Sequence, residues 1–529
     1  MRRHTMKMRR SLLALGTSAA LLSLAGGNAL ACGTSCTPST NSVSQSSSNS
    51  QILPLSIGLG VSAPINLSAP VGVLSPGANQ GSVTQKNSST STAKAVNAEV
   101  SQDASQNGNG GNNSASQSSS NSQILPIAIG ASISAPINLN LPIAVLSPGA
   151  NKGDVDQRND STASSRAANV EHDQSVNQWG GKNGNNSASQ SAANTQILPI
   201  ALGLGISAPI NVNAPIAVLS PGANKGDVKQ RNDSDARAEA LNNETEQSAI
   251  QKGGAHGGSN TASQSAVSSQ LLPIAVALAA AAPINANAPI AVLSPHANQG
   301  NVNQQGDADV FTEALNYELD QNAKQDGANG GTNSSSQSAS NSQILPVAAG
   351  VGIGLPINAN APIAALAPGA NKGDVKQRTN GDADVSAINN RTRQDVNQRG
   401  GSTNSATQSA VSSQLLALAP ALGAAAPVNA NAPIDVLTFF HHNDNGYGDV
   451  NQESKTTVTA ESINADVSQN ARQDGPASNH GPAATSAQPL PVAPATSAPA
   501  DVNMPIPVLS SLGSLLHNPF GLLRLLGGL

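Results

Sequence analysis

Few residues of this chain could do chemistry, and the cysteines are the first of them. Cys32 and Cys36 are the only two, separated by three residues. In an oxidising compartment they could close a small disulfide loop, and Cys32 alone could carry a lipid. Two thiols cannot fill the four ligand positions of a structural zinc site. The pair is therefore a candidate disulfide or lipid site rather than a metal centre.

The remaining nucleophiles and bases form no catalytic constellation. Serine is abundant, but no G-x-S-x-G phrase lies in a strand–turn–helix context. His172, His256, His296 and His480 occupy non-equivalent or variable positions, and we expect them to be solvated. We therefore predict no catalytic residue, no cofactor and no resident metal, so the chain is not expected to be an enzyme.

One aromatic cluster is a candidate contact loop. Phe439, Phe440 and Tyr447 are three of the seven aromatic residues in the chain, and His441 and His442 lie between them. The cluster falls in an insertion of four residues at a Gly/Asn-rich turn, which predicts a loop. The histidines and their acidic neighbours match no metal-binding spacing, so a solvated loop is the simpler interpretation.

These residues sit in a chain that repeats one phrase at an even interval. The proline of A-P-I-N falls at Pro64, Pro136, Pro209 and Pro283, and L-P-I-N continues the series at Pro356. These prolines are about 73 residues apart, and two further phrases keep that interval. The predicted units are a signal peptide (1–31), an N-terminal linker with the Cys pair (32–40), six repeats (41–112, 113–185, 186–259, 260–332, 333–403 and 404–474), a Pro/Ala-rich linker (475–498), and a truncated repeat with a Leu-rich tail (499–529).

Each repeat has an apolar half that ends in a turn. In the third copy Ile210 and Val212 alternate with Asn211 and Asn213, and this period of two is typical of an extended strand. Recurring prolines cannot donate to a ladder, so the strands should be short, kinked or at an edge. The phrase PGANKGD then supplies turn residues, because Gly and Asn tolerate positive φ.

The other half of each repeat is polar. Its third copy contains helix formers, as in RAEALNNETEQ, whereas Phe311, Leu315 and Leu319 of the fourth copy alternate as a strand would. Asn, Ser and Gly around these pieces also favour disorder. We predict a mainly β repeat protein of short strands in stacked repeats of about 73 residues, with solenoid-like or hairpin units and long, partly disordered Ser/Asn/Gly-rich segments.

Composition indicates an exported chain with no large aromatic core. Residues 1–31 combine five basic residues, an apolar segment and an A-x-A cleavage site, as secretory signals do. Without these residues the chain has a net charge of about −10, since 31 acidic residues then face 21 basic ones. Such a balance disfavours nucleic acid as a partner. We expect a secreted protein, extracellular or associated with the cell envelope.

Two phrases resemble bacterial surface proteins. The stretch SAPINVNAPIAVLSPGAN (207–224) resembles the hydrophobic domain of chaplins, which coat aerial filaments of actinomycetes, although the paired cysteines of most chaplin domains are absent from it. The stretches VNQWGGKNGNNSASQ and VNQRGGSTNSATQ are similar to curlin repeats in the spacing of Gln, Gly and Asn. Together these resemblances imply a secreted protein that assembles or coats.

Two functions are consistent with the sequence. The first is a structural protein of the bacterial cell surface that forms or joins a hydrophobic coat, matrix or self-assembled layer, with itself or cell-envelope components as partners. The second is an adhesin or spacer stalk whose binding end is repeat 6 or the C-terminal tail, which could also contact an interface. Prolines in every apolar block work against a dry steric zipper, so we expect stacking within the chain or adsorption rather than a simple fibre.

Overall fold

The computed structural model describes most of the repeat region. The described residues are 41–107, 112–180, 184–253, 258–327, 331–400, 403–415, 417–436 and 448–474, with five short strands between Ala477 and Val508. Within them every regular element is a β-strand. The prediction of a mainly β repeat protein of stacked units is therefore confirmed.

Each repeat forms one rung of a parallel β-solenoid. Rung 3 consists of β11 (Asn186–Ile197), β12 (Ile200–Ser207), β13 (Ile210–Asn213), β14 (Ile216–Val218) and the long return strand β15 (Val228–Lys252). The polar half, which the sequence left open between helix, strand and disorder, is thus a strand of 25 residues in this rung. Four short strands lead out to the turn, and one long strand leads back.

The other rungs repeat this order. Rungs 1 and 2 have a single return strand. Rung 1 is β1 (Asn41–Ile52), β2 (Leu55–Ser62), β3 (Ile65–Ser68), β4 (Val71–Val73) and β5 (Val83–Asn107), and rung 2 is β6 (Asn113–Ile124), β7 (Ile127–Ser134), β8 (Ile137–Asn140), β9 (Ile143–Val145) and β10 (Val155–Trp179).

In rungs 4 to 6 the return strand is divided in two. Rung 4 is β16 (Ser259–Leu271), β17 (Ile274–Ala281), β18 (Ile284–Asn287), β19 (Ile290–Val292), β20 (Val302–Leu315) and β21 (Glu318–Gly327). Rung 5 is β22 (Thr332–Ile344), β23 (Val347–Gly354), β24 (Ile357–Asn360), β25 (Ile363–Ala365), β26 (Val375–Ile388) and β27 (Arg391–Gly400). Rung 6 is β28 (Thr403–Leu415), β29 (Ala421–Ala425), β30 (Val428–Asn431), β31 (Ile434–Val436), β32 (Val450–Ile463) and β33 (Asp466–Asp474).

Rung 7 consists of short strands only, namely β34 (Ala477–Asn479), β35 (Ala483–Ala487), β36 (Ala495–Ser497), β37 (Ala500–Asn503) and β38 (Ile506–Val508).

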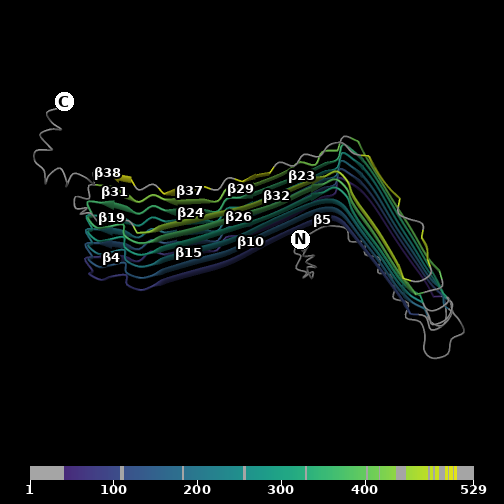
Figure 1. Ribbon diagram of the computed structural model, residues 1–529, viewed down its shortest axis with the longest axis horizontal. Helices are drawn as coiled ribbons and strands as arrows, with labels where there is room; N and C mark the ends of the chain where they lie inside the picture. Colours follow the sequence, from purple (N-terminus) through teal and green to yellow (C-terminus); the bar gives the residue numbers. More distant parts are fainter. Residues whose placement is uncertain are drawn as a thin grey trace, which may run out of the picture.

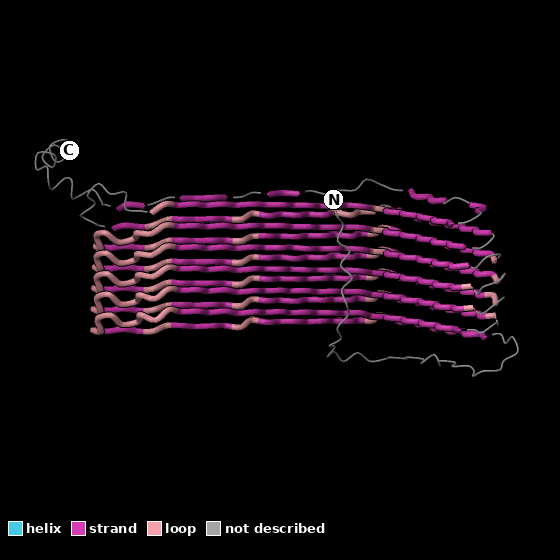
Figure 2. The backbone as a smooth tube through the Cα atoms, turned by 60° about the horizontal axis from the view of Figure 1, so that its bottom comes forward, coloured by secondary structure: helices cyan, strands magenta, loops and turns pink. Residues whose placement is uncertain are grey.

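Equivalent strands of successive rungs pair in parallel and build five sheets. We call them sheet A (from β1), sheet B (from β2), sheet C (from β3), sheet D (from β4) and sheet E (from β5). The register joins equivalent residues, so that Asn186 pairs with Asn113 on one side and with Asn260 on the other. Figures 1 and 2 show the result as a stack of nearly identical rungs.

Sheets A to D form one layer and sheet E the other. The layers lie very close together, because a Cβ atom added at Gly203 in β12 would be 2.5 Å from the backbone oxygen of Glu239 in β15. Where the layers approach this closely, only small side chains fit. The residues buried between the layers are accordingly Ala, Ser, Asn and Gln, with few large apolar side chains.

Buried amides form ladders along the stack, and the two amide types point in opposite directions. The Nδ2 of Asn138 donates to Oδ1 of Asn211 at 2.9 Å, towards the next rung. The Nε2 of Gln230 donates to Oε1 of Gln157 at 2.8 Å, towards the previous rung. Each ladder satisfies amides that would otherwise be costly to bury, and it fixes the register.

Corners between strands depend on residues with positive φ. Gly222 (φ 68°) and Asn224 (φ 53°) lie in the turn between sheets D and E, where the sequence predicted Gly and Asn in this role. Leu198 (φ 54°) turns the chain between sheets A and B, and Leu219 (φ 51°) begins the connection that leaves sheet D. Such a conformation is uncommon for leucine, yet it recurs at the equivalent leucines of successive rungs, so it is a fixed part of the rung. Figure 2 shows the loops between the strands repeated along the stack.

A bend divides the slab into two arms (Figure 1). The short arm contains sheet A and the second half of the return strands, and the long arm contains sheets B, C and D and the first half. In rung 4 the return strand breaks between Leu315 and Glu318. Tyr317 and Leu319 are buried there, whereas Phe311 lies on the outer side.

Candidate functional site

The long arm carries its large apolar side chains on the outside. In β12, Ala201, Gly203 and Ser207 face the return strand and are buried, while Leu202 and Leu204 point away from it. The close approach of the two layers explains this order, because Leu cannot fit where only Gly, Ala or Ser is tolerated. In this strand the small residues therefore face inward, and the large apolar residues of the alternating pattern face outward.

The same alternation continues through β13, and it corrects one expectation. Ile210 and Val212 lie on one side and Asn211 and Asn213 on the other, as predicted, but the Asn side is the buried one. Because a single repeat has too few bulky side chains to bury its apolar face alone, stacking of neighbouring repeats would be expected to cover that face. The structure contradicts this expectation. Stacking covers only the flanks of each side chain, which lowers exposure from 74% at Leu59 in rung 1 to 38% at Leu278 in the same column, but not to zero.

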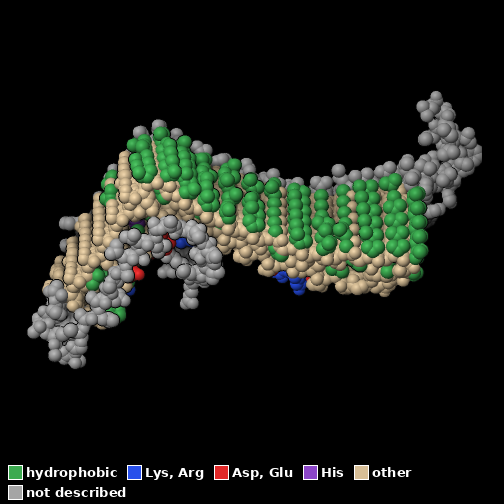
Figure 3. All heavy atoms as spheres, turned by 180° about the vertical axis from the view of Figure 1, so that it is seen from behind, with side chains coloured by type: hydrophobic (Ala, Val, Ile, Leu, Met, Phe, Trp, Pro, Cys, Tyr) green, Lys and Arg blue, Asp and Glu red, His purple; other side chains and the backbone are tan. Residues whose placement is uncertain are grey.

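Together these side chains form a broad surface, which we call the apolar face. It consists of the outward residues of sheets B, C and D, and Figure 3 shows them as parallel columns along the long arm. In rung 3 they are Ile200, Leu202, Leu204, Ile206, Ile210, Val212, Ile216 and Val218. Contiguous apolar surface of this extent marks an interaction site in a soluble chain.

The opposite face of the long arm is charged. On β15 the outward residues include Lys229, Arg231, Asp233, Asp235 and Arg237, and they alternate with buried Gln, Asn, Ser and Ala. Neighbouring charges pair along the strand, with Nη2 of Arg231 at 3.1 Å from Oδ2 of Asp233. The long arm is therefore an amphipathic slab with one apolar face and one charged face.

The outer face of sheet A in the short arm differs from both. In β6 the outward residues are mainly serines, among them Ser116, Ser118, Ser120 and Ser122, and they are exposed. The inward residues of the same strand, such as Gln117, are buried in amide ladders. The short arm thus presents hydroxyl groups where the long arm presents Ile, Leu and Val.

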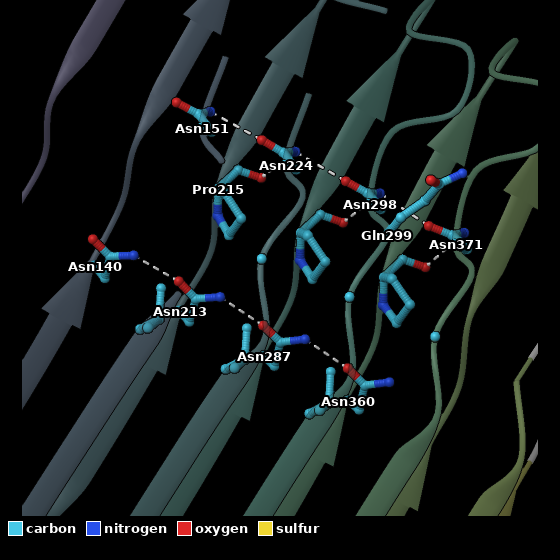
Figure 4. A pocket seen from close by; sticks show the side chains of 18 of the residues that line it. Asn140, Asn151, Asn213, Pro215, Asn224, Asn287, Asn298, Gln299, Asn360 and Asn371 are labelled. Carbon is cyan, nitrogen blue, oxygen red and sulfur yellow. Dashed lines mark hydrogen bonds between the residues drawn. The ribbon is translucent and has the colours of Figure 1, made fainter. Parts of the chain in front are cut away.

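A narrow channel of about 280 Å³ runs along the stack between the two layers, beside the turns (Figure 4). Columns of Pro, Val, Gly and Asn line it, and two Asn ladders follow its length. In one ladder Asn213 Nδ2 donates to Asn287 Oδ1 at 2.8 Å, and in the other Asn224 donates to Asn298 at 2.9 Å. Since these amides bind one another, we assign the channel a structural role.

Charged side chains gather where the arms meet. Arg166 contacts Glu171 at 3.1 Å, Glu239 at 3.0 Å and Glu244 at 2.5 Å. Burial raises the pKa of Glu244 to about 7, because its effect is larger than the opposing attraction of the Arg166 guanidinium. The pKa of Arg166 is itself raised, because the attraction of the three carboxylates exceeds the effect of burial.

A matching group lies on the next two rungs. Arg391 contacts Glu313 at 2.6 Å and Glu318 at 3.4 Å. Burial raises the pKa of Glu318 to about 6. Rungs 3 and 4 therefore place Glu239, Glu244, Glu313 and Glu318 side by side between two arginines, an arrangement that individual repeats do not reveal.

The predicted site residues lie outside the described residues. These are Cys32, Cys36, Phe439, Phe440, His441, His442 and Tyr447, and the C-terminal tail lies outside them as well. Within the described ranges, no group of three His, Cys, Asp or Glu side chains gathers as a metal site. Nor does that part of the chain contain a helix long and apolar enough to cross a membrane.

One histidine contradicts the sequence interpretation. His296 is exposed in a turn as expected, but His172 is fully buried, and neither ring nitrogen has a hydrogen-bond partner. Burial lowers its pKa to about 4. The parity of the strand could have predicted this, because His172 shares its side of β10 with the buried Gln174 and Gln178.

The orientation of the apolar columns was also missed, although the sequence contains a signal for it. In ALGLGIS (201–207) every second residue is Ala, Gly or Ser, which indicates that this side meets another backbone closely. Comparison with known proteins adds no further assignment: no protein-family model, no curated protein and no solved structure matches this chain.

Proposed function

We propose that this protein is a secreted structural protein of the bacterial cell surface that forms or joins a hydrophobic coat. In this coat the apolar face of the long arm lies against an apolar phase or layer, and the charged face of sheet E points to water. The observation that carries the proposal is the pair of opposite faces, Ile, Leu and Val on one side and Lys, Arg and Asp on the other.

The energetics favour adsorption. Complete burial of a Val, Leu or Ile side chain is worth roughly 1.5–3 kcal/mol, and these side chains are already partly covered by their neighbours. A gain of even about 0.5–1 kcal/mol at each outward position would be multiplied over the columns of six rungs. The rigid parallel register keeps the columns coplanar, so many contacts can form at once.

The test compares the full chain with two matched variants on a film balance. The first, Leu204→Thr with Leu278→Thr and Val351→Thr, makes three consecutive positions of one outward column polar while keeping residues that suit a strand. The second, Ser191→Thr with Ser265→Thr and Ser338→Thr, makes equivalent outward changes in the short arm. We expect the first variant to adsorb at least tenfold more weakly and the second to match the unaltered chain.

Equal adsorption of all three proteins would contradict the coat. The adhesin or stalk function predicts a different outcome, in which neither column matters but deletion of residues 437–447 or of the tail abolishes attachment to cells. Circular dichroism of each variant establishes that the strands are retained.

A further inference from the structure

Within the part of the chain that the structure describes, the first rung has an unpaired edge along its whole length. Among the described residues, each of the strands β1–β5 pairs on one side only. Strands β1–β4 contain no Lys, Arg, Asp, Glu or Pro, the residues with which natural sheets block pairing at an edge. Leu59 and Val61 on this rung are each 74% exposed, so covering the edge would also bury apolar surface.

The amide ladders leave complementary groups at this edge. Asn41 Nδ2 donates to Asn113 Oδ1 at 3.2 Å, so the Oδ1 of Asn41 remains an available acceptor. Gln123 Nε2 donates to Gln51 Oε1 at 3.0 Å, so the Nε2 of Gln51 remains an available donor. An additional rung stacked in register would bring the matching donor and acceptor.

Two charged columns on the outer side of sheet E distinguish the first rung from the sixth. One column is Lys86, Arg158, Arg231, Gln305, Arg378 and Glu453, and the other is Lys94, Arg166, Glu239, Glu313, Ser386 and Glu461. Both columns begin with Lys in rung 1 and end with Glu in rung 6. The chain therefore has one basic end and one acidic end in the same two columns.

Pairs of this kind already form between neighbouring rungs. Arg166 contacts Glu239 in the second column at 3.0 Å, and Arg378 contacts Glu453 in the first at 3.9 Å. If rung 1 of another copy followed rung 6, Lys86 would face Glu453 and Lys94 would face Glu461. One like-charge pair, Glu99 with Asp466, would arise beside them. The Nζ of Lys94 lies 3.5 Å from Oε2 of Glu99, so its positive charge offsets part of this repulsion.

Rung 7 covers the sixth rung only in part. Its strands pair with sheets A to D, and in the described part of the chain no strand follows β32 and β33 in sheet E. Three residues of β34 and five of β35 pair with β28, whereas thirteen residues of β22 do so on the other side. Rung 7 also interrupts one of the Asn columns, since Ala477 pairs with Asn404, although Asn503 continues another column beside Asn431.

From these observations we propose that copies of this chain join end to end, with rung 1 of one copy stacking on rung 6 of the next in place of rung 7. The inference rests on the proposed coat function, for which it names the partner as a second copy of the chain. Asn41 would then meet Asn404, and the two Lys–Glu columns would continue across the junction. Because this contact is heterologous, it does not close on itself and growth continues.

The experiment uses the full-length chain and four variants. The first-rung variant carries Lys86→Glu and Lys94→Glu, the sixth-rung variant carries Glu453→Lys and Glu461→Lys, and the exchanged variant carries all four changes. The control variant, Lys229→Glu with Lys376→Glu, reverses two outward charges in the interior of the stack. Sedimentation velocity and electron microscopy follow elongation from monomer.

We expect the unaltered chain and the control to elongate, and each end variant alone to elongate at least tenfold more slowly. An equimolar mixture of the two end variants should recover the rate, because each supplies the charge that the other needs, and the exchanged variant should recover it alone. Recovery excludes unfolding as the cause of the loss, since the same substitutions are present.

Three outcomes would overturn the inference: no elongation by the unaltered chain, elongation indifferent to the end charges, or growth that stops at a dimer. The film balance separates this failure from failure of the coat, because the end variants leave the apolar face intact. Normal adsorption without elongation would refute end-to-end joining alone, whereas elongation without adsorption would refute the coat alone.

Discussion

The two arms share one backbone design but differ in the residues that face solvent. In both arms parallel strands pair in perfect register, small or amide side chains fill the space between the layers, and Asn and Gln ladders run along the stack. The short arm exposes serines at Ser116 and Ser118, and the long arm exposes Leu202 and Leu204. Inward residues therefore determine the fold of each arm, and outward residues are free to determine its interactions.

The inward residues also differ in a way that follows from the spacing of the layers. In the long arm Gly203 and Gly205 lie almost against the backbone of β15. In the short arm Ala188 and Val176 belong to one core cluster, and the buried Gln190 is a long side chain. Beside β12 the long arm therefore accepts only Gly, Ala or Ser, whereas the short arm has room for Val and Gln. Opposite sheet C the long arm also buries Gln157 and Gln230.

The largest expected effect concerns this spacing. A Val at position 203 would force its side chain into the backbone of Glu239, and we expect Gly203→Val to lower the free energy of unfolding by roughly 3 kcal/mol or more. The outward Ala193→Val, beside Val267 in the next rung, should change stability by less than about 0.5 kcal/mol. Denaturant unfolding measures both, and similar values for the two would contradict the close approach of the layers.

The next-largest expected effect is on the pH dependence of stability, through Glu244 at the junction of the arms. The folded-state pKa of Glu244 is about 7, above its value in an unfolded chain, so the folded state binds the proton more tightly. The resulting stabilisation is complete below about pH 4.5 and is lost as the pH rises through 7. At about 1.4 kcal/mol per pKa unit, the rise from 4.5 to about 7 corresponds to a change of roughly 3 kcal/mol.

Glu244→Gln should remove this part of the pH dependence between pH 5 and 8, as measured by unfolding at each pH. Glu453→Gln, a change on the exposed outer side of sheet E, is the matched control. A pH profile identical to that of the unaltered chain would show that Glu244 is fully ionised in the folded protein.

A smaller change, this time an increase in the free energy of unfolding, is expected at His172 in the short arm. Its ring is buried between Val100 and Thr245 in the neighbouring rungs without a hydrogen-bond partner. We expect His172→Val to raise the free energy of unfolding by roughly 1–2 kcal/mol at pH 7. The change at the exposed His296→Val should be close to zero.

The same variant tests the protonation of His172. Its folded-state pKa of about 4 is below the unfolded value, so stability is retained above about pH 6.5 and lost as the pH falls through 4. His172→Val should abolish this acid sensitivity. If the variant were instead less stable than the unaltered chain, an unseen partner would have to satisfy the imidazole.

The smallest effect on stability should accompany a change of surface character. Ser189→Val with Ser263→Val and Ser336→Val places an apolar column on the short arm, and each outward substitution should cost less than about 0.5 kcal/mol. Adsorption at an apolar interface should nevertheless become stronger. If adsorption did not change, the outward columns would have to lie away from the interface.

Much of this architecture was predictable from the sequence. The interval of about 73 residues predicted stacking, the alternation in INVN (210–213) predicted strands, and Gly222 and Asn224 predicted the turn. Orientation was harder, because period-two alternation identifies two sides but does not say which is buried. The usual preference for buried Ile and Val fails in sheets B, C and D, because their inward side lies too close to sheet E to admit these residues.

The charged groups could not be found from single repeats. Glu244 and Glu318 are ordinary surface residues in their own sequence context, and they become neighbours only because the register stacks rung 3 on rung 4. The burial of His172 likewise depends on the parity of a strand of 25 residues. These features arise from pairing between residues more than 70 positions apart.

The opposite directions of the Asn and Gln ladders have an electrical consequence. A row of aligned amides adds its dipoles, as peptide units do in an α-helix, and a long one-way stack would accumulate opposite partial charges at its two ends. In this chain the Asn138 ladder runs towards rung 6 and the Gln157 ladder runs towards rung 1, so their dipoles largely cancel. A stack of this kind can be lengthened without building a field that opposes further growth.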